Sequence, residues 1–119
     1  MKKTLYGIPN CDTVKKARTW LAEQGQDFDF HDFKKQGLSR DIAAGWLKQL
    51  DWEVLVNRKG LTWRNLTDEQ KAAVKDKDSA LELMLANPSV IKRPVLDAGG
   101  KLTVGFSAAQ YQQFFGVPG

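Results

Sequence analysis

The opening of the chain alternates strand, helix and strand patterns, and this order constrains the fold more than any other feature of the sequence. Residues 3–8 combine apolar and β-favouring side chains and predict a strand. A helix is predicted from about residue 11 to residue 24, because apolar side chains recur at helical spacing (Val14, Ala17 and Leu21). In residues 27–33 phenylalanines alternate with Asp and His, which predicts a second strand. Such a β-α-β unit has parallel strands joined by a right-handed crossover.

A helical block follows, over about residues 39–87. Ser39 is a predicted N-cap, and Thr67-x-x-Gln70 is a capping-box pattern that opens a later helix. Asp78 is predicted to cap the last helix of the block, which Asn87-Pro88 ends.

The chain then returns to strands. Residues 94–97 and 102–105 are short β runs joined by Gly99-Gly100, a favourable hairpin turn. Ser107-x-x-Gln110, a second capping-box pattern, opens the final helix. The element order, β-α-β, a helical block and β-β-α, is that of an α/β, thioredoxin-like fold. We expect one domain, in which 1–38 and 88–119 form the thioredoxin-like portion and 39–87 is a helical insertion.

Length and charge describe an ordinary globular protein. The 119 residues fit one domain, and the net charge of +4 comes from 18 Lys and Arg against 14 Asp and Glu. Because the basic residues are interleaved with acidic ones, a solvated surface is favoured over a nucleic-acid face. No apolar run reaches the ~18–20 residues of a membrane span, and the chain starts with a strand rather than a signal peptide. We therefore expect a cytoplasmic protein without a membrane partner.

The chain contains one cysteine, Cys11, and one histidine, His31. A single cysteine excludes an internal disulfide and a two-cysteine redox switch. A zinc site needs about three or four Cys, His or carboxylate ligands, so no metal site is expected.

Cys11 follows the first predicted strand and opens the first predicted helix. With Asn10 as the N-cap, the sulfur would lie near unpaired backbone N–H groups and the positive end of the helix dipole. Lys15, one turn later, would add positive charge. These features favour the thiolate, which is only a few per cent of an ordinary cysteine near neutral pH. The alternative is a small buried apolar residue, a common environment for free cysteine.

Two arginines are candidates for binding an anion. The planar guanidinium of Arg58 suits carboxylates and oxyanions, although an exposed loop cation is the alternative. Pro94 opens a predicted strand, where it cannot donate a hydrogen bond to the sheet. A cis bond there would turn Arg93 toward the loop that precedes Cys11, whereas a trans proline at a strand start is the alternative.

Four segments stand out, in order along nearly the whole chain: YGIPNCDT from Tyr6, FHDFKKQG from Phe30, WRNL from Trp63 and NPSVIKRPV from Asn87. In these segments the chain resembles the ArsC-related proteins, especially their YffB-like branch. The resemblance implies the thioredoxin-like fold with a helical insertion and makes a cis bond before Pro94 the expected form.

The resemblance also implies a chemistry. In glutathione-dependent arsenate reductases of this superfamily, the cysteine at the helix start attacks arsenate and arginines hold the oxyanion. Cys11 matches that nucleophile, and Arg93 matches one of the arginines. Arg58 lies one place from a second arginine position, which Asn57 occupies. No cation stands near residues 105–106, where a third arginine of those enzymes falls.

The first functional hypothesis is an oxidoreductase, a glutathione-dependent monothiol reductase with Cys11 as its nucleophile. Because the chain has one thiol, the second must come from glutathione as cosubstrate or from a glutaredoxin. The residues expected to contact the substrate are Asn10, Lys15, Arg58, Arg93 and Pro94.

Two further hypotheses come from the same resemblance. Spx-type regulators bind RNA polymerase and sense redox state through a Cys-x-x-Cys pair, so a non-enzymatic protein that binds RNA polymerase or another macromolecule is the second. Its internal switch cannot operate here, because Val14 stands three residues after Cys11. Arsenate reduction is the third, although Val14 and Lys15 replace the serine and arginine that follow the cysteine of those enzymes.

Overall fold

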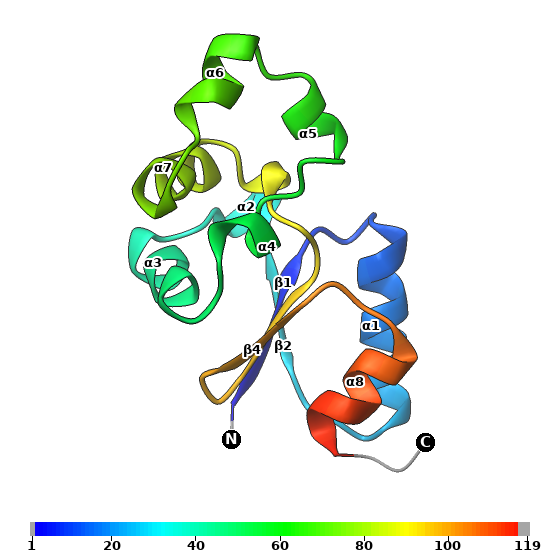
Figure 1. Cartoon of the computed structure of the whole chain (residues 1–119). Coiled ribbons are helices and arrows are strands. Elements are labelled where there is room, and N and C mark those ends of the chain that lie inside the picture. The colour runs from blue at the N-terminus through cyan, green and yellow to red at the C-terminus, as the bar shows by residue number, and fades with distance from the viewer. Residues whose placement is uncertain (1, 117–119) are drawn as a thin grey trace. The chain divides into compact units, whose positions relative to one another are not determined.

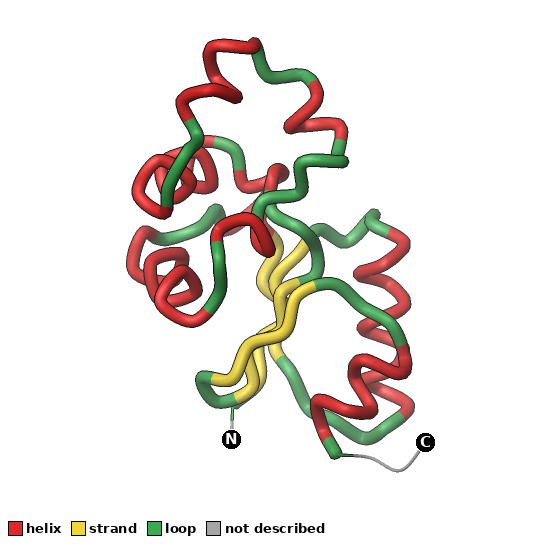
Figure 2. The backbone as a smooth tube through the Cα atoms, in the orientation of Figure 1, coloured by secondary structure: helices red, strands yellow, loops and turns green. Residues whose placement is uncertain are grey.

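The computed structural model describes residues 2–116 (Figure 1). The chain divides into two compact units: one runs to Lys35 and resumes at Arg93, and the other is Gln36–Lys92. The insertion predicted over 39–87 lies inside the second unit. The strands fall in the first unit, and the second consists of helices and loops (Figure 2).

Four strands form one sheet in the first unit. They are β1 (Lys3–Gly7), β2 (Asp29–Asp32), β3 (Val95–Ala98) and β4 (Lys101–Val104), in the spatial order β2-β1-β3-β4. β1 is parallel to β2 and antiparallel to β3, which is antiparallel to β4. Helix α1 (Asp12–Glu23) connects β1 to β2. The parallel β-α-β unit predicted from the sequence is therefore confirmed.

The turn between β3 and β4 is the predicted glycine hairpin. Gly99 and Gly100 have φ values of 66° and 96°, a region that L side chains rarely adopt. The backbone N–H of Gly100 donates to Oδ1 of Asp97 at 2.8 Å and closes the turn.

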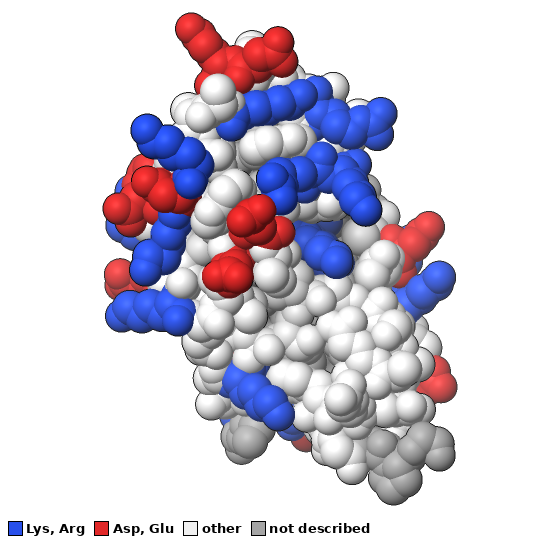
Figure 3. Space-filling view, in the orientation of Figure 1, with Lys and Arg blue, Asp and Glu red and all other residues white. Residues whose placement is uncertain are grey.

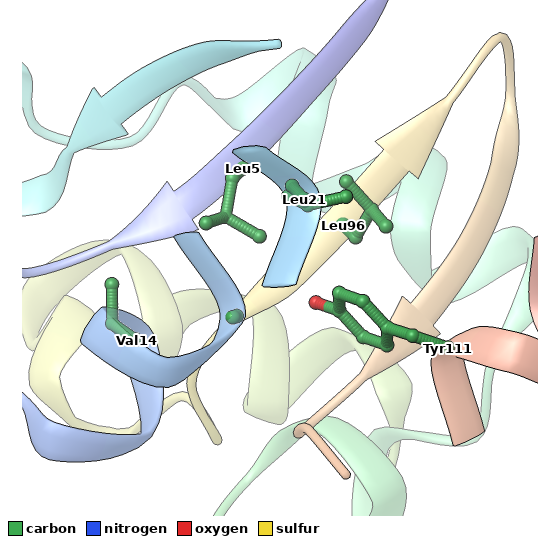
Figure 4. Packing of buried hydrophobic residues seen from close by; sticks show 6 residues of the cluster. Leu5, Val14, Leu21, Leu96 and Tyr111 are labelled. Atoms are coloured by element: carbon green, nitrogen blue, oxygen red, sulfur yellow. The ribbon is translucent and has the colours of Figure 1, made fainter. Parts of the chain in front are cut away.

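Helix α8 (Ala108–Phe115) packs with α1 on one face of the sheet. The side chains between them form the core of the first unit (Figure 4), and all are fully buried: Leu5, Val14, Ala17, Leu21, Leu96 and Tyr111. Since apolar burial stabilises by roughly 25 cal/mol per Å², this cluster fixes both helices on the sheet.

Gly7 lets α1 approach the end of β1 closely. A Cβ atom at this position would lie 2.8 Å from Cγ2 of Val14, which is fully buried. Real Cβ atoms essentially never come this close to a neighbour. Glycine at the end of β1 therefore sets the position of the first turn of α1.

Two of the predicted helix starts in the second unit are confirmed. Oγ of Ser39 accepts from the backbone N–H of Ile42 at 3.2 Å, at the start of α3 (Arg40–Gln49). Thr67 and Gln70 form a complete capping box before α6 (Asp68–Ala73).

The predicted cap at Asp78 is wrong. The N-cap of α7 (Lys77–Ala86) is Asp76, whose Oδ1 accepts from the N–H of Ser79 at 2.9 Å. Oγ of Ser79 in turn accepts from the N–H of Asp76 at 3.1 Å. This reciprocal pair satisfies two helix-end donors at once and places Asp78 in the first turn.

The capping box predicted at Ser107 is only half formed. Ser107 accepts from the N–H of Gln110 at 3.0 Å, but the Gln110 side chain does not complete a box. Its Nε2 donates to Oγ1 of Thr103 at 2.7 Å and to the carbonyl of Val104 at 2.9 Å. Gln110 therefore ties α8 to β4.

The second unit also contains a short backbone pairing. Val56 and Ile91 form an isolated antiparallel bridge, flanked by bonds from Lys92 N–H to the Leu55 carbonyl at 2.7 Å and from Asn57 N–H to the Val90 carbonyl at 2.8 Å. The remaining short helices of the described chain are α2 (Phe33–Gln36), α4 (Trp52–Leu55), α5 (Leu61–Arg64) and the 3₁₀ helix η1 (Pro88–Val90). Within residues 2–116, no helix combines the length and apolar character required to span a membrane.

Replacing Tyr111 with phenylalanine should not destabilise the protein. The Tyr111 hydroxyl is buried and has no hydrogen-bond partner among the described residues. An unsatisfied buried hydroxyl costs free energy, so we expect the free energy of unfolding of Tyr111→Phe to be unchanged or up to about 1 kcal/mol higher. Urea denaturation measures this. A loss of more than about 1 kcal/mol would contradict the assignment.

Both tyrosines should ionise late in the folded protein. Burial raises the pKa of Tyr111, and burial together with the Asp97 carboxylate raises the pKa of Tyr6, partly offset by a hydrogen bond with Thr4. Because an unfolded tyrosine has a pKa of ~10, the folded state is fully favoured below that pH and loses stability as pH rises above it. At pH ~10, near-ultraviolet absorbance should show far less phenolate in the native chain than in the urea-unfolded chain. Equal phenolate in both would contradict the burial of the two rings.

Candidate functional site

Cys11 itself is the N-cap of α1. Its backbone is extended, with φ −92° and ψ 125°, and its carbonyl accepts from the N–H of Lys15 at 2.9 Å. The sequence interpretation with Asn10 as N-cap is therefore wrong by one residue: Asn10 lies in the turn before the cap. The side chain of an N-cap residue faces the free N–H groups of the first turn. Because Cys11 is the N-cap, its sulfur lies on the side chain that faces these groups.

Cys11 is half-buried. It packs against the core cluster under α1, yet its surface remains partly exposed, and its side chain makes no capping hydrogen bond. Cys11 is therefore not the fully buried packing residue that the sequence analysis gave as the alternative. A thiol that is anchored on one side and open on the other is accessible to a small disulfide or an alkylating reagent.

The charged side chains nearest along α1 have opposite signs. Lys15 is exposed one helical turn after Cys11, and Asp12 is exposed in the first turn. The positive end of the helix dipole lies at the same terminus. Lys15 and the dipole favour an anion beside Cys11, and Asp12 opposes them.

The register of the sheet places the Arg93–Pro94 segment at the same end as Cys11. Tyr6 in β1 pairs with Val95 in β3, so the residues that follow β1 and those that precede β3 lie at one end of the sheet. The Arg93–Pro94 peptide bond is cis, which confirms the form expected from the family resemblance. Pro94 is buried and Arg93 is partly exposed.

The loop after β4 reaches the same end of the sheet. The backbone N–H of Gly105 donates to the carbonyl of Pro94 at 2.8 Å. Phe106 follows, and it packs against the core cluster that Cys11 also contacts. Residues 105–106, around which the family resemblance places a third arginine, therefore lie at this end of the sheet, and neither is a cation.

Arg58 belongs to the second unit. It is exposed, its Nη2 lies 2.8 Å from Oε2 of Glu53, and its Cζ lies 5.5 Å from the ring centroid of Trp52. The alternative interpretation, an exposed loop cation, therefore describes it well. Arg58 already has a carboxylate partner, which an incoming anion would have to displace.

A groove in the first unit contains Lys15, which the sequence predicted, together with residues that the sequence interpretation missed. It is lined by residues of α1 and by the loop after β4: Lys15, Lys16, Thr19, Trp20, Glu23 and Phe106. The four-residue spacing of Cys11, Lys15 and Thr19 would have placed these three on one helix face. The contribution of Phe106 depends on tertiary structure, so no local pattern could reveal it.

The sequence profile of the ArsC family matches residues 6–114. This chain belongs to the ArsC family. A solved YffB protein shares 48% identity, covers 94% of this chain and 97% of its own, and superposes with a TM-score of 0.89. An ArsC-related protein from Brucella melitensis is 53% identical, with coverages of 97% and 95% and a TM-score of 0.76. The thioredoxin-like fold predicted from the element order is thereby confirmed.

The relatives of the chain include an uncharacterized protein and a transcriptional regulator. A protein of Haemophilus influenzae described only as uncharacterized is 45% identical over 94% of this chain and 97% of its own. The global transcriptional regulator Spx of Streptococcus pyogenes is 26% identical over 93% of this chain and 83% of its own. A transcriptional regulator is therefore among the relatives of this chain.

Proposed function

We propose that this ArsC-family protein is a glutathione-dependent monothiol reductase in which Cys11 is the nucleophile. The observation that carries the proposal is the position of the only cysteine in the chain. It is the half-exposed N-cap of α1, at the sheet end that also holds the cis Arg93–Pro94 bond. The proposal includes a cytoplasmic location, where free thiols persist.

In the first step the Cys11 thiolate attacks the glutathione sulfur of a mixed disulfide, R–S–S–G. The S–S bond breaks, and the substrate leaves as R–S⁻, which takes a proton from solvent. Cys11 is left as a mixed disulfide with glutathione. The sulfur attacks from the N-cap position, whose side chain faces the free N–H groups at the start of α1.

In the second step a glutathione thiolate attacks the glutathione sulfur on Cys11. Oxidised glutathione leaves, and the Cys11 thiolate is restored. The net reaction is R–S–S–G + GSH → R–SH + GSSG, so the substrate is reduced and glutathione is oxidised. External glutathione, or a glutaredoxin acting in its place, is required because the chain has no second thiol.

Substrate binding would use the groups around the sulfur. Lys15 is one turn from Cys11, and Arg93 precedes β3 at the same end of the sheet as Cys11. Both can pair with the carboxylates of glutathione. Asn10 lies in the turn beside the cap. Arg58 belongs to the second unit and is paired with Glu53, so the proposal assigns no step to it.

The direct test is reduction of a neutral small disulfide, 2-hydroxyethyl disulfide, by glutathione. Coupling to glutathione reductase converts oxidised glutathione into a loss of NADPH absorbance. We expect turnover proportional to protein concentration. A rate equal to that of glutathione alone would remove the proposal.

The similarity to Spx favours one alternative, a protein that binds a macromolecular partner such as RNA polymerase without turnover. Purified RNA polymerase retained by the immobilised protein, together with no disulfide reduction, would support that alternative. Arsenate reduction is tested in the same coupled assay with arsenate as substrate. Family membership supports this activity, but no cation stands at residues 105–106, where the resemblance implies a third arginine for the oxyanion.

A further inference from the structure

The groove along α1 begins at Lys15, one helical turn after Cys11, and has two chemical parts. Its floor includes the aromatic rings of Trp20 and Phe106, both partly exposed. Lys15 and Lys16 are exposed near the Cys11 end, and Glu23 is exposed at the other. The proposed reaction needs only Cys11 and a positive group near it, so it does not explain an aromatic floor.

The spacing of the lining residues gives the groove its length. Lys15, Thr19 and Glu23 follow one another at four-residue intervals and therefore lie on one face of the helix, and Cys11 stands one such interval before Lys15. From Lys15 to Glu23 the helix rises about 12 Å, at ~1.5 Å per residue. An extended peptide of about three or four residues covers that distance.

The aromatic floor is held in place from below by Tyr111. The Tyr111 ring meets Trp20 edge to face at a centroid distance of 5.5 Å and Phe106 at 4.7 Å. Trp20 also stacks on Phe115 at 5.7 Å. Because Tyr111 is fully buried, both floor residues are fixed before any ligand binds. A preformed apolar surface loses little conformational entropy on binding.

The charge of the groove selects among possible occupants. Two lysines against one glutamate favour an anionic group near Cys11, and an apolar group fits the floor beyond it. Glutathione offers carboxylates but no aromatic side chain. A peptide with an acidic residue and an aromatic residue within about four positions of its cysteine offers both.

We infer that the groove binds the peptide part of an S-glutathionylated protein, in a segment that carries an acidic and an aromatic residue close to its modified cysteine. This inference rests on the proposed function and specifies its substrate class. The acidic side chain pairs with Lys15 or Lys16, and the aromatic side chain lies on Trp20 and Phe106. The disulfide is thereby placed over Cys11, whose attack releases the peptide thiolate.

The test is binding of three synthetic S-glutathionylated pentapeptides to the Cys11→Ser protein, followed by amide chemical shifts in NMR. One peptide carries Glu and Phe, the second Lys and Phe, and the third Glu and Ala. The Glu–Phe peptide should shift the amides of Lys15, Thr19, Trp20 and Phe106. Replacing its Glu by Lys, or its Phe by Ala, should weaken binding about 3- to 10-fold in each case.

A charge reversal in the groove has a matched control elsewhere. Lys16→Glu should lower affinity for the Glu–Phe peptide about fivefold and raise affinity for the Lys–Phe peptide. Lys75→Glu makes the same change of charge at an exposed position that does not line the groove, and should alter neither.

The peptide-binding inference and the proposed reductase activity can fail independently, and the outcomes distinguish them. Equal binding of the three peptides, equal shifts caused by glutathione alone, or shifts confined to other residues would overturn it. Turnover of 2-hydroxyethyl disulfide without peptide discrimination would overturn the inference and leave the proposed function standing. Selective peptide binding without any turnover would support the groove as a peptide-binding site and would contradict the proposed reductase activity.

Discussion

Replacing Cys11 with serine is expected to lower glutathione-dependent disulfide reduction to the rate of glutathione alone. Cys11 is the only cysteine of the chain, so no other protein thiol can form the mixed disulfide. A serine hydroxyl is not ionised near neutral pH and does not exchange with disulfides. The coupled assay with 2-hydroxyethyl disulfide measures the effect, and turnover retained in Cys11→Ser would rule out the mechanism.

The same substitution should leave the fold intact. Serine is one of the preferred N-cap residues, and the cysteine it replaces makes no capping hydrogen bond. We therefore expect the thermal midpoint of Cys11→Ser to equal or exceed that of the parent protein. Circular dichroism checks this, so that loss of activity in the variant is assigned to the missing thiol and not to unfolding.

Gly7→Ala is expected to cause the second large effect, a fall of about 1–3 kcal/mol in the free energy of unfolding. The added methyl group would lie 2.8 Å from Cγ2 of Val14, inside the core cluster. Since β1 and α1 would have to separate, the first turn of α1 and Cys11 would move with them. We expect disulfide reduction to fall as well. Urea denaturation and the coupled assay measure the two consequences.

Two controls isolate the steric cause. Gly45→Ala introduces the same methyl group in α3, where nothing lies within 4 Å, and should stabilise by about 0.5–1 kcal/mol. Val14→Ala removes the clashing methyl groups, so the Gly7→Ala/Val14→Ala double variant should lose less than the sum of the single losses. A Gly7→Ala protein as stable as its parent would show that the contact does not limit the packing of β1 and α1.

The fold was predictable where local pattern and global structure agree. The alternation around Phe28 and Phe30, the helical spacing from Val14 to Leu21 and the turn at Gly99-Gly100 all predicted the elements that the structure contains. The caps were less predictable because several polar residues compete near each helix start. Asp76 displaces Asp78 through its reciprocal pair with Ser79, which forms only once the helix is in place.

Parts of the candidate site were predictable for the same reason. Cys11 stands at a strand–helix boundary that the sequence predicts to within one residue, and Lys15 follows at helical spacing. The aromatic floor was not predictable, because Phe106 reaches α1 from a loop that follows β4. Arg58 was identified by its residue type, and its ion pair with Glu53 depends on the local fold of the second unit.

The distribution of charged side chains does not indicate where the candidate site lies. On the face drawn in Figure 3, Lys and Arg side chains stand beside Asp and Glu side chains. This mixture matches the interleaved charges of the sequence, and a net charge of +4 alone does not indicate where an anion binds.

The most direct test of the account is the rate at which iodoacetamide alkylates Cys11 near pH 7, in the native chain and in the same chain unfolded in urea. The chain has one thiol, so mass spectrometry reports that site alone. A Cys11 sulfur that is accessible and faces the free N–H groups at the start of α1 should react about 3- to 10-fold faster in the native chain. A native rate equal to or below the unfolded rate would mean that Cys11 is retained for packing, and would contradict its role as the nucleophile.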